Sequence, residues 1–85
     1  MWIRSQNRIV LINADKFIVS KEHEVFRIYS VNYFLGEYST EEKAMKVMDM
    51  IEDEILKCEA MRTGYAEYDF GAFVFDMPAD KDVEV

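Results

Sequence analysis

The sequence has few of the residues on which many small protein sites are built. Its 85 residues include one cysteine (Cys58), one histidine (His23), one proline (Pro78) and three glycines. A single cysteine excludes an internal disulfide, and the opening Met1–Gln6 lacks the apolar stretch of a signal peptide. No run approaches the about 18 apolar residues of a membrane-spanning helix. We therefore expect a soluble, cytoplasmic chain that folds without a disulfide.

The motifs of common catalytic and metal sites are also missing. There is no Gly-x-Ser-x-Gly elbow, no glycine-rich phosphate loop and no cysteine with a plausible base. His23 lies between Glu22 and Glu24, but neighbouring side chains on an extended backbone point in opposite directions and do not converge on one metal. The alternating carboxylates of residues 80–84 match the first positions of a calcium loop but lack its glycine and closing glutamate. The sequence therefore predicts a protein that is not an enzyme and holds no cofactor.

Acidic residues dominate the charge, and they are unevenly placed. The net charge is −7; residues 1–36 carry five basic and three acidic side chains, whereas the remainder carries five basic and fourteen acidic ones. The acidic part would repel a phosphate backbone, which argues against direct nucleic-acid binding. Such acidity commonly serves only solubility. A sharper hypothesis is a surface that imitates DNA phosphates and occupies the basic cleft of another protein.

One long helix is predicted over residues 39–64. Ser39 is expected as the N-cap with Glu42 three residues later, and Gly64 as the C-terminal cap. Apolar side chains recur at helical spacing and predict one buried stripe. The residues of that stripe are Ala44, Met48, Ile51, Ile55 and Cys58.

Short β-branched and aromatic segments on both sides of the helix predict strands. Five precede it and are expected to form an antiparallel meander, with a sixth after it, ended by Pro78. Trp2 and Arg4 should share one strand face and Ile3 the other, and Gly36 should mark a bulge or a close approach to the backbone. The expected strands are Trp2–Ser5, Ile9–Ile12 (buried on both faces), Lys16–Ser20, Val25–Ser30, Tyr33–Tyr38 and Phe70–Met77.

These elements indicate a single α+β domain over residues 1–78, with a mostly antiparallel sheet of about five or six strands and one long helix packed across it. The acidic residues 79–85 offer little apolar surface and follow a strand-ending proline. They are expected to form a frayed tail.

The helix supplies the candidate partner-binding residues. Three carboxylates lie roughly opposite the buried stripe and should project together into solvent. Three apolar side chains fall about 100° to either side of that stripe, and flexible methionines there are typical of adaptable binding surfaces. Simple packing at the edge of the core is the more common reason for apolar residues in such places. The candidates are Glu42, Asp49, Asp53, Met45, Met50 and Leu56.

Three stretches, Met1–Gln6, Leu35–Ile51 and Phe73–Pro78, resemble a family of small uncharacterised proteins of Gram-positive bacteria and their phages and prophages, which open with Met-Trp-Ile-Arg-Ser-Gln. The family usually has leucine at the positions of Met45 and Met48, a conservative difference that leaves the core assignment intact. The resemblance implies a setting of mobile elements. In that setting small acidic proteins often act by binding a host or competitor protein.

These observations support the hypothesis of a non-enzymatic, acidic protein-binding module with an unidentified protein partner and no membrane association. Its concrete form is inhibition of a host nucleic-acid-handling protein. The alternative is a self-associating structural or accessory protein, in which an uncovered sheet edge or the methionine flanks form a homodimer. A native mass measurement would separate the two hypotheses.

Overall fold

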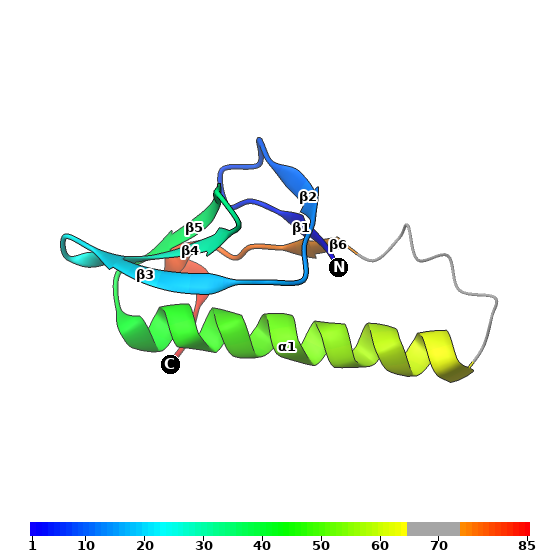
Figure 1. Cartoon of the computed structure of the whole chain (residues 1–85). Helices are drawn as coiled ribbons and strands as arrows, with labels where there is room; N and C mark the ends of the chain where they lie inside the picture. The colour runs from blue at the N-terminus through cyan, green and yellow to red at the C-terminus, as the bar shows by residue number, and fades with distance from the viewer. Residues whose placement is uncertain (65–73) are drawn as a thin grey trace.

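The computed structural model describes residues 1–64 and 74–85, and side-chain burial in residues 1–57 and 74–85. It contains two three-stranded sheets above one long helix, which confirms the α+β prediction (Figure 1). The elements are β1 (Trp2–Arg4), β2 (Leu11–Asn13), β3 (Ile18–Glu22), β4 (Val25–Ser30), β5 (Tyr33–Tyr38), α1 (Glu41–Gly64), β6 (Val74–Asp76) and the 3-10 helix η2 (Asp80–Asp82).

The strands are divided differently from the predicted meander. Their order is β2-β1-β6 in one sheet and β3-β4-β5 in the other. Strand β6 runs parallel to β1, with Trp2 opposite Val74, whereas every other described pair is antiparallel. Two parallel strands need a long connection between them, and α1 is part of the chain that connects β1 to β6. The single meander is therefore wrong, because a pattern of alternation identifies a strand but not its neighbour.

Strand β2 is shorter and more exposed than predicted. It begins at Leu11, and the side chains of Ile9 and Leu11 are 83% and 45% exposed. The expectation that Ile9–Ile12 is buried on both faces is therefore wrong. The strand lies at the edge of its sheet with β1 as its neighbour, so its outward side chains have no second layer to pack against.

Both features predicted at Gly36 are present. The register of β4 and β5 shifts beside the Ile28–Gly36 pair, as a bulge does. A Cβ atom on Gly36 would lie 3.1 Å from the ring and hydroxyl of Tyr38 and 3.3 Å from the methyl group of Met77. The glycine thus leaves room for a tyrosine ring that is fully buried.

The core lies between α1 and the inner faces of the two sheets. From α1, Ala44, Val47 and Ile51 are buried, while Met48 and Ile55 are partly buried. The prediction is therefore correct for the middle of the buried stripe, at Ile51, but the buried side of α1 also includes Val47, which lies outside the predicted stripe. The expectations for Cys58 and for the Gly64 cap concern residues outside those whose side chains are described. The buried apolar residues are Ile3, Ala14, Ile28, Leu35, Tyr38, Ala44, Val47, Ile51, Met77 and Val83.

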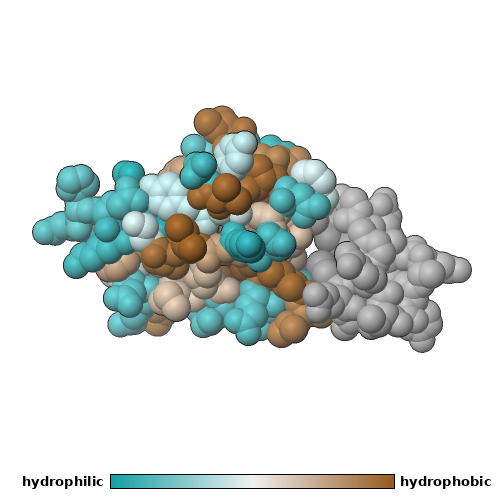
Figure 2. Space-filling view, in the orientation of Figure 1, coloured by the Kyte–Doolittle hydropathy of each residue, from teal (hydrophilic) through white to brown (hydrophobic). Residues whose placement is uncertain are grey.

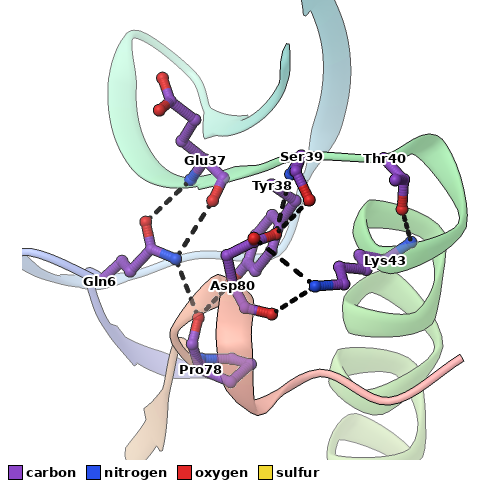
Figure 3. Close-up of polar contacts among 8 residues, drawn as sticks. All are labelled: Gln6, Glu37, Tyr38, Ser39, Thr40, Lys43, Pro78 and Asp80. Carbon is purple, nitrogen blue, oxygen red and sulfur yellow. Dashed lines mark hydrogen bonds and ion pairs between the residues drawn. The ribbon is translucent and has the colours of Figure 1, made fainter.

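Thr40, rather than Ser39, caps the N-terminus of α1. The backbone N–H of Lys43 donates to the Thr40 hydroxyl oxygen at 3.2 Å, the bond expected of an N-cap. The backbone N–H and hydroxyl of Ser39 instead donate to a carboxylate oxygen of Asp80, at 2.8 and 3.0 Å (Figure 3). The predicted pairing of Ser39 with Glu42 is therefore wrong, because a distant carboxylate takes both Ser39 donors.

The C-terminal segment is docked on the domain. The Lys43 ammonium donates to the backbone carbonyl of Asp80 at 2.9 Å and lies 3.5 Å from its carboxylate. The buried Tyr38 hydroxyl donates to the Pro78 carbonyl at 2.8 Å, and Val83 belongs to the core (Figure 3). The expectation that residues 79–85 fray is therefore wrong. The partners of this segment lie about 40 positions earlier, where no local pattern reveals them.

Gln6 joins the two sheets. Its side-chain amide accepts from the backbone N–H of Glu37 at 3.0 Å and donates to the carbonyls of Glu37 and Pro78 at 3.2 and 3.0 Å. Its backbone N–H donates to the Leu35 carbonyl at 2.7 Å. Gln6, which lies between the first two predicted strands, thus satisfies backbone groups along the free side of β5.

Val31 is strained in the turn that joins β4 to β5. Residues 31–32 form the predicted two-residue turn, and Val31 has a φ of 56°, a conformation that a β-branched residue rarely adopts. We expect Val31→Gly to raise the free energy of unfolding by roughly 1 kcal/mol, because glycine adopts positive φ without a steric cost. Little packing is lost, since Val31 is 72% exposed.

Urea denaturation of the parent and the Val31→Gly protein measures this difference. Val31→Ala is the matched control: it retains a Cβ atom, and we expect it to gain less than the glycine variant. A glycine variant that unfolds at a lower urea concentration than the parent would show that the turn is not strained in solution.

Candidate functional site

The candidate site predicted on the helix lies on the solvent side of α1. Met45 and Leu56 are 47% and 57% exposed, large fractions for apolar side chains of this size. Met50 is half-buried and belongs to the edge of the core. Five of the six candidates thus share an open surface: Glu42, Met45, Asp49, Asp53 and Leu56.

One further acidic residue, Glu52, belongs to this surface. Met45, Asp49, Glu52 and Leu56 follow one another at spacings of four, three and four residues, which places them along one line of a helix. With a rise of about 1.5 Å per residue, this line is about 16 Å long. Glu52 is not among the residues predicted from the sequence, although its spacing from Met45 is the signal that could have identified it. We call the six exposed residues the outer stripe: Glu42, Met45, Asp49, Glu52, Asp53 and Leu56.

Among the described residues, the carboxylates of the outer stripe have no ion-pair partner. The sequence suggests i,i+4 ion pairs of Glu42 with Lys46 and of Asp53 with Lys57. In the part of the chain that is described, neither pair forms, and Lys57 lies 3.5 Å from Glu54 instead. Exposed charges of this kind act over about 8 Å at physiological ionic strength. The stripe therefore presents a row of carboxylates that form no ion pair with a described residue.

A shallow hollow lies on the outer face of β3-β4-β5. It measures about 420 Å³ and is lined by Gln6, Arg27, Tyr29, Phe34 and Glu37. Arg27 donates from Nε to Glu37 at 2.9 Å, and its charge is therefore already partly offset. The rings of Tyr29 and Phe34 meet edge to face, with centroids 5.9 Å apart.

Two ion-paired groups beside this hollow, Glu22 and Arg27, have pKa values shifted in the direction that favours their charged forms. A hydrogen bond from Tyr29 is the main reason that the pKa of Glu22 lies below its usual value, and the nearby Arg27 adds to the effect. Arg27 also donates from Nη1 to Glu22 at 3.2 Å. A carboxylate held ionised in this way is a poor general base, since efficient ones titrate near neutral pH. The charged side chains at the hollow thus form an ion-pair cluster of Arg27 with Glu22 and Glu37.

Residues 1–64 and 74–85 contain no group of three His, Cys, Asp or Glu side chains arranged to hold a metal ion. His23 occupies the first position of the two-residue turn that joins β3 to β4. Within the same described residues, no helix is both long enough and apolar enough to cross a membrane. Comparison with known proteins finds no matching family model, curated protein or solved structure.

The carboxylate of Asp80 holds the C-terminal segment against the start of α1. Its pKa lies below the usual value, chiefly because the Ser39 backbone N–H donates to it; the Ser39 hydroxyl and Lys43 contribute further, and burial opposes them. A carboxylate with a lowered folded-state pKa stabilises the folded chain above its unfolded pKa of about 4, and this contribution is lost as the pH falls through the folded pKa.

We expect Asp80→Asn to lower the free energy of unfolding by about 1 kcal/mol at pH 7. The effect is this small because Asp80 is partly exposed, and water weakens its charged contacts. Below pH 4 the difference between parent and variant should shrink, because the parent carboxylate becomes protonated. Urea denaturation at pH 7 and pH 3 measures both differences. Asp82→Asn changes the same charge on an exposed neighbour and should leave stability nearly unchanged. A pH-independent difference between parent and Asp80→Asn would contradict this account.

Proposed function

We propose that this chain is a non-enzymatic protein-binding module that presents the outer stripe of α1 to a basic surface on another protein. The observation that carries the proposal is the absence of ion-pair partners, within the described chain, for the exposed carboxylates of Glu42, Asp49 and Asp53. Exposed Met45 and Leu56 accompany them. Charge gives such a surface its attraction and orientation, and apolar side chains give it contact area that excludes water.

The arrangement of the charges supports a nucleic-acid-handling protein as the concrete partner. Asp49 and Asp53 are about 6 Å apart along the axis of α1, and Glu42 lies about 10 Å before Asp49. A basic cleft that holds phosphates along a rod-shaped duplex would meet a comparable row of negative charges on this helix. We further propose that this partner is a host protein, as membership in the expected family of phage and prophage proteins would imply.

The test is a triple charge reversal, Glu42→Lys, Asp49→Lys and Asp53→Lys. Each reversal adds two positive charges, so the net charge changes from −7 to −1. We expect the affinity for the partner to fall by about a hundredfold or more, because three attractive contacts become repulsive. Folding should survive, since exposed charges contribute little to stability.

The measurement is capture from a bacterial host extract on immobilised protein, followed by stepwise elution with salt and identification of the retained proteins. The matched control reverses Asp15, Glu24 and Glu84, which are exposed elsewhere and give the same net charge. Parent and control should retain the same basic protein and release it as salt rises, whereas the stripe variant should not retain it. Equal retention by the two variants, both folded by circular dichroism, would contradict the proposal.

A further inference from the structure

The outer face of the β2-β1-β6 sheet carries large apolar side chains in the open. Trp2, Leu11 and Val74 are 41%, 45% and 41% exposed. The register places Trp2 between Asn13 on β2 and Val74 on β6, and places Leu11 beside Arg4. Trp2 lies on the side of β1 opposite to buried Ile3, as predicted for this strand, and Leu11 and Val74 lie on the same side of the sheet. Tryptophan is the residue most enriched among side chains that dominate binding energy, so this surface is a candidate interface.

The same face is basic within an acidic protein. Arg8 lies 3.3 Å from Asp76, and Arg4 donates from Nη1 to the Arg8 carbonyl at 3.3 Å. In the described part of the chain, the buried Nε of Arg4 has no hydrogen-bond partner. The face therefore carries two guanidinium groups and one carboxylate, that of Asp76, which the register places opposite Arg4, and its net charge is positive. We call this surface the Trp2 face: Trp2, Arg4, Arg8, Leu11, Val74 and Asp76.

We expect a partner for the Trp2 face to be apolar with carboxylates beside the apolar groups, because the face joins apolar side chains to a net positive charge and guanidinium groups favour carboxylate acceptors. The chain itself carries such a surface. The outer stripe of α1 places the carboxylates of Asp49 and Glu52 between two exposed apolar side chains, Met45 and Leu56.

The spacing within the two surfaces also agrees. Trp2 and Arg4 are two residues apart on β1, a distance of about 7 Å, and Glu52 and Leu56 are about one helical turn apart on α1, a distance of about 6 Å. A helix laid on the face with Leu56 over Trp2 would therefore set the Glu52 carboxylate near Arg4. We propose that the Trp2 face binds the outer stripe of a second copy of this chain. The proposal rests on the proposed function in one respect, since it uses the same stripe as a binding surface.

The two surfaces lie on opposite sides of the molecule, because the core separates α1 from both sheets (Figure 1). In the space-filling view, hydrophobic side chains interrupt the hydrophilic surface above, over the sheets, and also along the lower side, where α1 lies (Figure 2). One copy can therefore bind a second through its Trp2 face and a third through its outer stripe. Such a contact joins unlike surfaces and does not close on itself, so assembly should continue beyond the dimer as concentration rises.

The experiment is sedimentation of the purified protein over a range of concentrations, with one variant for each surface. Leu11→Glu adds a negative charge to the Trp2 face, and Leu56→Lys adds a positive charge to the outer stripe; both side chains are substantially exposed, so folding should be retained. The parent should form dimers and larger species. Each variant alone should associate at least tenfold more weakly.

An equimolar mixture of the two variants provides the sharpest measurement. Leu11→Glu keeps an intact stripe and Leu56→Lys keeps an intact Trp2 face, so the mixture should form a one-to-one dimer that does not grow. The matched control Ile18→Glu alters an exposed isoleucine on the other sheet and should assemble like the parent. A monomeric parent at every concentration, a mixture that fails to associate, or a loss of assembly in Ile18→Glu would overturn the proposal.

The same variants separate this inference from the proposed function. Leu11→Glu retains the outer stripe and should still capture the basic protein from host extract. Capture by this variant together with a monomeric parent would overturn self-association alone. Assembly of the parent without capture of any basic protein would overturn the proposed function and leave self-association supported.

Discussion

Replacing Ile51 with alanine is expected to lower the free energy of unfolding by about 2–5 kcal/mol. The side chain is 2% exposed and lies in the middle of the buried side of α1, so its removal loses transfer free energy and leaves a cavity. Alanine is the best helix former, so the loss would not come from helix propensity. A domain of this size is stabilised by roughly 5–10 kcal/mol in total. The variant should therefore unfold at a much lower urea concentration than the parent.

Leu56→Ala is the matched control for Ile51→Ala. It removes a side chain of the same volume from the same helix, but at a site that is 57% exposed. We expect its effect to stay within about 0.5 kcal/mol, since exposed substitutions rarely exceed this. Equal effects of the two substitutions in urea denaturation would show that α1 packs through a different face.

Deleting residues 79–85 is expected to lower the free energy of unfolding by about 3–4 kcal/mol. The deletion removes buried Val83, whose burial is worth about 1.5–3 kcal/mol. It also removes the Asp80 carboxylate, which leaves the Ser39 donors and the Lys43 ammonium without their partner. Hydrogen bonds to a charged group contribute about 1.5–3 kcal/mol when sheltered and less at an exposed site such as this one.

Thermal and urea denaturation of the truncated protein test the deletion. Removing only residues 84–85 is the control, because both side chains are exposed and neither reaches the core. The short truncation should match the parent, while the long one should melt well below it. A long truncation with the stability of the parent would show that the segment does not dock in solution.

Sequence by itself determined the elements whose signal is local. The helix was predictable because apolar side chains that recur at a period near 3.6 over many residues fit a helix and do not fit a strand, and Ile51 was correctly placed at the middle of its buried side. The turn at residues 31–32 and the bulge beside Gly36 were predictable because turn chemistry and a missing side chain act within a few positions. The exposure of Glu42, Asp49 and Asp53 followed from the same helical period.

Only the tertiary structure decided which of these elements meet. The parallel pairing of β6 with β1, the amide of Gln6 along β5 and the docking of Asp80 at Ser39 each join groups that are 31 to 72 positions apart. The Asp80 contact in turn transfers the helix cap from Ser39 to Thr40. Contacts over such separations depend on the packing of the whole core, whereas a residue pattern reports only the preferences of its immediate neighbours. The tertiary structure also brought Trp2, Leu11 and Val74 onto one face, because these side chains come from three strands whose pairing no local pattern reveals.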